Sequence, residues 1–150
     1  MHMNENDPIR FQTICNAYDI HKELVTYLMN DFGVEGKLSE TDEWILKQFR
    51  TDLYSDSRKL ITCLEIANAI YITNIEEYNE RRLNMDRGIG YCNVLKADCQ
   101  RVITTFRGRI NVNKYEKVTD LILKEINMIK GWRKSDNKIK ARITPTGQGC

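Results

Sequence analysis

Several features that identify common protein classes are scarce or missing in this chain of 150 residues. It has only two prolines and eight glycines, which excludes collagen-like and linker-type proteins. No segment approaches the roughly 18 uncharged apolar residues of a membrane span, and residues 1–10 are polar rather than a basic start followed by an apolar run. We therefore expect one folded cytoplasmic domain, without a transmembrane helix or a secretion signal.

Cysteine and histidine are too sparse and too scattered to build a metal site. An odd count suits free thiols in a reducing compartment, and no two of the five cysteines form a CxxC pair. The two histidines, His2 and His21, lie far from any close cysteine pair, so the four local ligands of a structural zinc site are missing. Neither histidine follows a glutamate by three residues, as a di-iron bundle requires. We expect no metal and a solvated His21.

The usual catalytic motifs are also absent. The sequence contains no Walker A loop, no GxSxG and no HExxH. The Gly88-Ile89-Gly90 triplet lies in a helical pattern rather than between a strand and a helix, which excludes a dinucleotide loop. Glu65 and Glu125 fall in apolar stretches, where a Lys or Arg partner is the ordinary explanation. We expect neither catalytic residues nor a cofactor, and the protein is predicted not to be an enzyme.

What the sequence does contain is helical periodicity along nearly its whole length. Apolar residues recur at intervals of three and four, and no segment alternates like a strand. Four helices are predicted, over residues 8–32, 39–72, 73–108 and 113–137. Their starts are marked by Asp7-Pro8, by Ser39 or Thr41, by Thr73 with Glu76, and by Asn113 with Glu116.

Short connections make sequential helices antiparallel. The predicted fold is therefore all-α: an antiparallel up-down-up-down four-helix bundle over residues 1–137, followed by a flexible basic C-terminal tail over 138–150 that contains Pro145, Gly147 and Gly149. Ser55-Asp56-Ser57 is a candidate kink in the second helix. Gly88 and Gly90 indicate either close helix packing or a local kink in the third. Cys92 and Cys99, seven residues apart on one face, are predicted to be small core residues.

Charge is unevenly divided between the two halves of the chain. Residues 1–80 contain 7 Lys or Arg and 15 Asp or Glu, whereas residues 81–150 contain 16 and 6. Such asymmetry indicates a polyanion or an acidic partner facing the second half. Two interpretations stay open: nucleic acid bound at this surface, or an acidic half that simply neutralises a basic half within one fold.

The bundle topology gathers most of the basic residues at one end. Residues 130–142 alone contain six basic side chains and one acidic one, a density typical of phosphate-binding patches. The predicted nucleic-acid-binding residues are Arg81, Arg82, Arg87, Lys130, Arg133, Lys134, Lys138, Lys140 and Arg142. A second basic site, expected at the opposite end, comprises Arg107, Arg109, Lys114 and Lys117.

The run from Tyr115 to Lys138, YEKVTDLILKEINMIKGWRKSDNK, resembles the last helix of the accessory variability determinant (Avd-like) proteins of diversity-generating retroelements. The segment from Arg82 to Phe106 resembles that family's third helix. The related four-helix proteins encoded in 23S ribosomal RNA intervening sequences share the same pattern. The family motif matches Gly131, Trp132, Arg133 and Lys134, whereas the acidic first half and the Gly88/Gly90 pair depart from it.

The resemblance implies a non-enzymatic bundle that forms a homopentamer, binds RNA or DNA and a reverse transcriptase, and supports template-primed mutagenic cDNA synthesis. Gly131 and Trp132 are then expected at an oligomer or partner interface, although Trp132 also suits a core anchor. The alternative is a structural or protein-interaction bundle, such as an intervening-sequence protein, with no nucleic-acid role.

Overall fold

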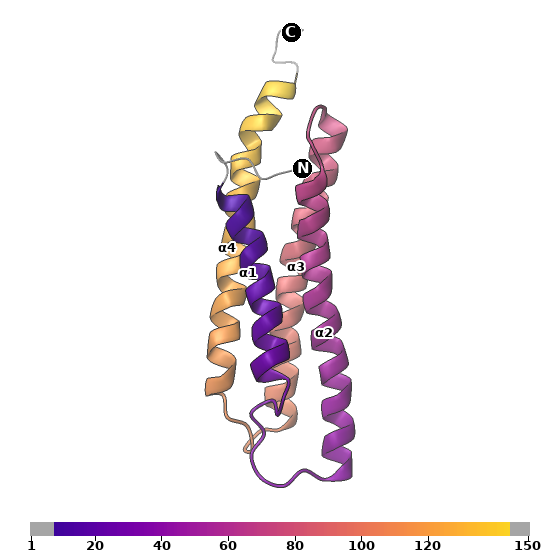
Figure 1. Cartoon of the computed structure of the whole chain (residues 1–150), viewed down its shortest axis with the longest axis vertical. Coiled ribbons are helices and arrows are strands. Elements are labelled where there is room, and N and C mark those ends of the chain that lie inside the picture. The colour runs from indigo at the N-terminus through magenta and orange to yellow at the C-terminus, as the bar shows by residue number, and fades with distance from the viewer. Residues whose placement is uncertain (1–7, 145–150) are drawn as a thin grey trace.

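The computed structural model describes residues 8–144, which form four long helices (Figure 1). Helix α1 spans Pro8–Glu23 and continues into a π-helical turn, η1, at Leu24–Leu28; α2 spans Glu40–Ala69, α3 Ile75–Thr105 and α4 Asn113–Ile143. Within these residues the only extended pairing is an isolated bridge between Val34 and Ile110. The predicted all-α class is confirmed. No helix in this part of the chain combines the length and apolar character needed to cross a bilayer.

The helices pack as a square, each against two neighbours. Helix α1 contacts α2 and α4, and α3 contacts the same two helices. Near one end of the molecule, Arg10 of α1 hydrogen-bonds Asn68 of α2, and Tyr78 of α3 hydrogen-bonds Asn137 of α4. The described parts of α2 and α4 do not contact each other and occupy diagonal corners. This packing is compatible with the predicted four-helix bundle.

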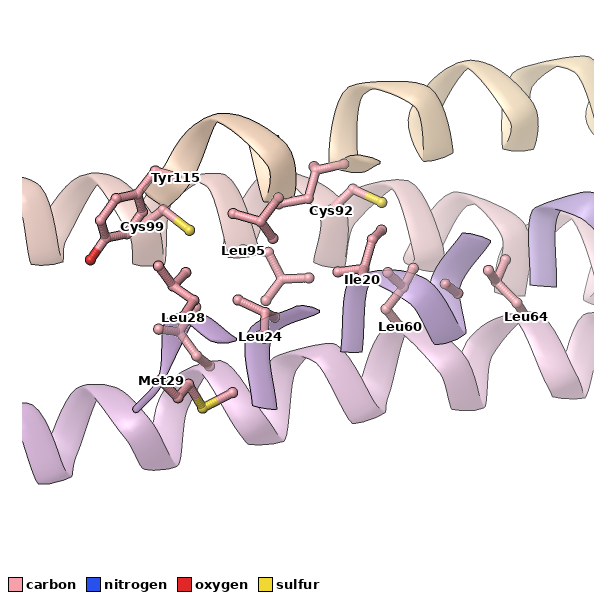
Figure 2. Packing of buried hydrophobic residues seen from close by; sticks show 14 of the residues in the cluster. Ile20, Leu24, Leu28, Met29, Leu60, Leu64, Cys92, Leu95, Cys99 and Tyr115 are labelled. Carbon is pink, nitrogen blue, oxygen red and sulfur yellow. The ribbon is translucent and has the colours of Figure 1, made fainter. Parts of the chain in front are cut away.

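The core is mainly aliphatic and runs the length of the bundle. Figure 2 shows Leu24 and Leu28 of η1 on the inner side of the bundle, facing α3 residues such as Leu95, and all three are at most 1% exposed. Burying each such side chain contributes about 1.5–3 kcal/mol. Cys92 and Cys99 are buried in the same cluster, so the prediction that they are core residues is confirmed. They and the other described cysteines are free thiols, whereas Cys150 and His2 lie outside the described residues.

Two helix starts test the capping predictions. Ser39 caps α2 through a capping box in which the Ser39 hydroxyl accepts from the Asp42 amide and the Asp42 carboxylate accepts from the Ser39 amide. The cap of α3 is displaced by one residue from the prediction, because Asn74 accepts from the Glu77 amide. The Glu77 carboxylate accepts in turn from the Thr73 amide.

Helix α4 departs from the prediction at both ends. Asn113 is its first helical residue rather than its cap. The capping position, Val112, makes no side-chain hydrogen bond, and the Asn113 amide donates to the Asn111 side-chain oxygen at 3.1 Å. At the other end the helix continues to Ile143, so the predicted helix end at residue 137 is wrong. Residues 138–143 contain no helix breaker, and lysine, alanine and arginine favour helix. The remaining predicted tail, with Pro145, lies outside the described residues, as does Asp7.

Helices α2 and α3 both continue through the positions where the sequence suggested a kink. Helix α2 runs unbroken through Ser57, whose hydroxyl bonds the Tyr54 carbonyl oxygen. Helix α3 runs unbroken through Gly88, where an added Cβ would lie 3.1 Å from Leu64 Cδ2 and 3.4 Å from Ile129 Cδ1. Gly88 therefore lets α3 approach α2 and α4 closely. At Gly90 an added Cβ would meet nothing within 4 Å, so close packing does not explain that glycine.

Candidate nucleic-acid interface

Helix α4 carries most of the excess positive charge. It contains nine Lys or Arg and four Asp or Glu. Beyond Leu121 its only two carboxylates are Glu125 and Asp136, and these are 0% and 2% exposed. The exposed surface of this part of α4 is therefore positively charged without an exposed α4 carboxylate. Its exposed cations are Lys124, Lys130, Lys134, Lys138, Lys140 and Arg142.

Four of these cations form a regular series, which we call the basic row: Lys130, Lys134, Lys138 and Arg142. Residues four apart are neighbours on one side of a helix and rise by about 6 Å per step. None of the four has a carboxylate within ion-pairing distance in the part of the chain that the structure describes. The extension of α4 to Ile143 is what places Lys138 and Arg142 in this row.

Arg81, predicted to bind nucleic acid, is instead a core residue. It is 2% exposed, and its Nε lies 3.0 Å from Asp136 Oδ2. Its guanidinium also donates to the second Asp136 oxygen at 3.1 Å and to the Ile70 carbonyl oxygen at 3.3 Å. The prediction for Arg81 is wrong, because a buried arginine paired with a buried carboxylate cannot reach a phosphate.

Trp132 is also inside the single chain rather than at an interface. It is 0% exposed, and the guanidinium carbons of Arg10 and Arg81 lie 5.7 Å and 5.3 Å from its ring centroid. Gly131 is half-buried, with an added Cβ 3.7 Å from Ile9 of α1. The predicted interface role of Trp132 is therefore wrong, and Gly131 lies where α1 packs on α4.

Three other predicted residues, Arg82, Arg133 and Lys140, lie beside the basic row and contact α3 side chains. Asp86 of α3 accepts from Arg133 at 2.7 Å and lies 3.8 Å from Arg82, which also donates to the Tyr78 hydroxyl. Lys140 Nζ lies 5.5 Å from the Tyr78 ring centroid.

Arg87 belongs to a different side of the molecule. Burial raises the pKa of the Cys63 thiol on α2, and the nearby Arg87 charge acts in the opposite direction. Arg87 is thus an exposed α3 residue whose charge acts on α2, and α2 and α4 are not neighbours in the bundle. The structure therefore separates Arg87 from the basic row.

The second predicted basic site is largely neutralised by the first half of the chain. Arg109 pairs with Asp42 at 3.0 Å. Lys114 pairs with Asp31 at 2.6 Å and Lys117 with Glu23 at 3.1 Å. Arg107 is exposed and forms no ion pair among the described residues. At this end the acidic half balances the basic half, whereas along the second part of α4 it does not.

Three other polar residues differ from their predicted environments. His21 is half-buried rather than solvated, with Nδ1 2.7 Å from the Ser57 hydroxyl, and burial lowers its pKa. Glu65 is exposed and accepts from the Tyr18 hydroxyl. Glu125 is buried, but its partner is the Asn16 amide at 3.2 Å rather than a Lys or Arg. Within residues 8–144 no cluster of three or more His, Cys, Asp or Glu side chains is arranged to hold a metal.

Lys124 is the exposed cation that the sequence prediction left out. It lies six residues before Lys130 on the same helix and extends the exposed positive surface toward the middle of α4. The sequence contained the signal for it: Lys124 lies between the buried Ile122 and Glu125, and its position is not part of the apolar stripe of α4.

Comparisons with protein-family models, with curated proteins and with solved structures found no match to this chain.

Proposed function

We propose that this protein is a non-enzymatic, nucleic-acid-binding bundle protein that uses the exposed side of α4 to contact phosphates. The observation that supports this most strongly is the stretch from Lys124 to Arg142, where every exposed charge is positive and the two carboxylates of the stretch, Glu125 and Asp136, are buried. In the proposal, the molecule is an antiparallel up-down-up-down bundle, and its acidic helices face away from the nucleic acid or toward a basic partner.

The expected mode of binding is electrostatic and independent of sequence. Lysine and arginine that contact phosphates release condensed counterions, so affinity falls with salt. If the four residues of the basic row each contact one phosphate of a duplex, log K is expected to fall with log salt at a slope of about −4. Such contacts orient the protein on the backbone and carry no base information.

The resemblance supplies the biological setting of the proposal. Of its two quoted segments, Tyr115 to Lys138 lies on α4, the helix that carries the basic row, and Arg82 to Phe106 lies on α3 and its C-cap. We therefore place the protein with the Avd-like accessory proteins: a cytoplasmic homo-oligomer, pentameric by resemblance, that brings RNA or DNA to the reverse transcriptase of a diversity-generating retroelement. Its mass in solution and its co-purification with the reverse transcriptase test this setting.

The nucleic-acid role is tested by charge reversal on the basic row. Affinity for a labelled structured RNA is measured by fluorescence anisotropy for the wild type and for Lys130→Glu/Lys134→Glu/Lys138→Glu. The matched control is Lys47→Glu/Lys96→Glu/Arg107→Glu, which changes the net charge equally at exposed positions on α2, α3 and the 106–112 connection. We expect at least a tenfold loss for the row variant and a small loss for the control. Equal losses would refute a localised interface.

A second candidate function is a structural or protein-interaction bundle, such as a ribosomal RNA intervening-sequence protein. It is favoured by large exposed side chains, including Trp44 at 63% and Tyr71 at 72%. A groove of about 680 Å³ between η1 and α2, lined partly by Met29 and Tyr54, adds an apolar surface on the side away from the basic row. Absence of RNA binding at low salt, together with capture of a protein partner, would favour this candidate.

A further inference from the structure

The basic row lies on a ridge that lacks exposed aromatic side chains. The two aromatic residues of α4, Tyr115 and Trp132, are 3% and 0% exposed. Tyr115 is directed inward, where its hydroxyl donates to the Phe32 carbonyl oxygen at 2.6 Å. Among the exposed residues of the second part of α4, the remaining side chains are aliphatic or amide, at Leu123, Asn127, Asn137 and Ala141. The ridge therefore offers cations without a stacking surface.

This composition distinguishes between two classes of nucleic acid. Proteins that bind single strands combine a positive groove with aromatic side chains on which successive bases stack. The bases of a duplex are already stacked on one another, and a duplex presents its phosphates at the surface, with one charge per about 1.7 Å of axis in B-form DNA. A ridge of cations without aromatics matches the second arrangement.

The geometry of the row is also that of a rigid backbone contact. From Lys130 to Arg142 the helix rises about 18 Å, and from Lys124 about 27 Å. Four-residue steps advance about 40° beyond a full turn, so the row slants across the exposed side of α4. The row begins near Arg133, which forms an ion pair with Asp86 of α3. From there it moves away from the side of α4 that packs against α3. On that side Glu76 of α3 and Lys140 line the same pocket. The cations thus diverge from the carboxylates of α3.

We propose that the basic row binds the phosphate backbone of a nucleic-acid duplex, with little affinity for single strands. This inference rests on the proposed nucleic-acid function and specifies its ligand. Each row cation contacts one phosphate, the α4 ridge follows the backbone, and no side chain reads or stacks on a base. The ligand can be duplex RNA, duplex DNA or a hybrid, which share this chemistry.

The experiment compares four 20-nucleotide probes at equal phosphate concentration across a salt series: duplex RNA, duplex DNA, and a single strand of each. We expect at least one duplex to bind at least tenfold more tightly than both single strands, with a slope of log K against log salt of about −4. Scrambling the duplex sequence leaves its affinity unchanged. The affinities of the duplexes relative to each other identify which backbone geometry the row fits.

Two variants separate the outcomes. Lys130→Glu/Lys134→Glu/Lys138→Glu is expected to lose duplex binding, while Tyr71→Ala, which removes an exposed aromatic of the α2–α3 connection, leaves it unchanged. Single strands that bind as tightly as duplexes, or a loss of affinity in Tyr71→Ala, would overturn the duplex assignment and leave the proposed function standing. No binding to any probe at low salt would overturn the proposed function itself.

Discussion

The buried carboxyl of Glu125 makes the stability of this bundle depend on pH. Its side chain lies between α4 and α1, where the Asn16 amide donates to Oε1 at 3.2 Å and to the Leu121 carbonyl oxygen at 2.9 Å. Glu125 Oε2 and Asn16 Oδ1 have no hydrogen-bond partner in the described part of the chain. Burial raises the Glu125 pKa from 4.5 to about 8, against the opposing effects of Asn16 and Lys124; Asp19 adds to the rise.

The sign of the effect follows from where the proton is held. The folded protein keeps the Glu125 proton up to a pKa of about 8, whereas the unfolded chain releases it near 4.5. Stability is therefore complete below the unfolded pKa and falls as pH rises through the interval between the two values. The expected slope is about 1.4 kcal/mol per pH unit, so between pH 5 and pH 8 this single group lowers the free energy of unfolding by about 3 kcal/mol.

The substitution Glu125→Gln removes this titration. The glutamine oxygen can accept from Asn16 as Glu125 does, and its amide can donate to Asn16 Oδ1. Urea unfolding followed by circular dichroism at pH 5 and pH 8 is the assay. We expect the variant to match the wild type within about 1 kcal/mol at pH 5 and to exceed it by about 3 kcal/mol at pH 8.

The matched control is Glu80→Gln, an exposed glutamate on α3, which should follow the wild type at both pH values. The pH dependence that remains in Glu125→Gln combines Asp98, whose pKa burial and the neighbouring Asp56 raise to about 7, with His21, whose pKa burial lowers and whose effect has the opposite sign. Identical pH dependence in the wild type and Glu125→Gln would refute the reasoning.

Two further predictions concern packing. Asp136→Asn removes the charge that faces Arg81 in an ion pair only 2–3% exposed, so urea unfolding should show a free energy of unfolding lower by about 3 kcal/mol. Asp86→Asn, at the more exposed pair with Arg133, should lower it by less than about 1 kcal/mol. Equal losses would contradict the burial of the Asp136 pair. Gly90→Ala should raise stability by about 0.5–1 kcal/mol, because the added Cβ has no atom within 4 Å. Gly88→Val should lower stability by about 1–3 kcal/mol, because the added Cβ would lie 3.1 Å from Leu64 Cδ2. Thermal unfolding measures both, and a stabilised Gly88→Val would contradict the close packing of α3.

The sequence was informative about where the helices lie and less so about how they begin and end. Apolar spacing located all four helices, and the Ser39 cap followed from a local hydrogen-bonding pattern. The extension of α4 was missed because its last turns contain few apolar residues, so periodicity had nothing to detect there. Its stability there follows from helix propensity and from the buried Asp136, neither of which produces an apolar stripe.

The candidate site was only partly predictable because its charges are sorted by tertiary contacts. Arg109 and Lys117 looked as available as Lys134 in the sequence, yet their partners, Asp42 and Glu23, lie 67 and 94 positions away. No local pattern contains that information. The burial of acidic residues was readable, however, since α4 positions 118, 122, 125, 129, 132 and 136 alternate in steps of four and three and are all buried. A glutamate and an aspartate in that stripe leave the exposed side of the second part of α4 basic.

The central claim is that the exposed side of α4 is a phosphate-binding surface, and the salt dependence of duplex binding tests it most directly. Affinity for a 20-base-pair duplex should fall with a slope of log K against log salt of about −4 in the wild type, and reversal of Lys130, Lys134 and Lys138 should reduce the magnitude of the slope by about 3. A wild-type affinity that does not change with salt, or a slope that survives this reversal, would contradict the account.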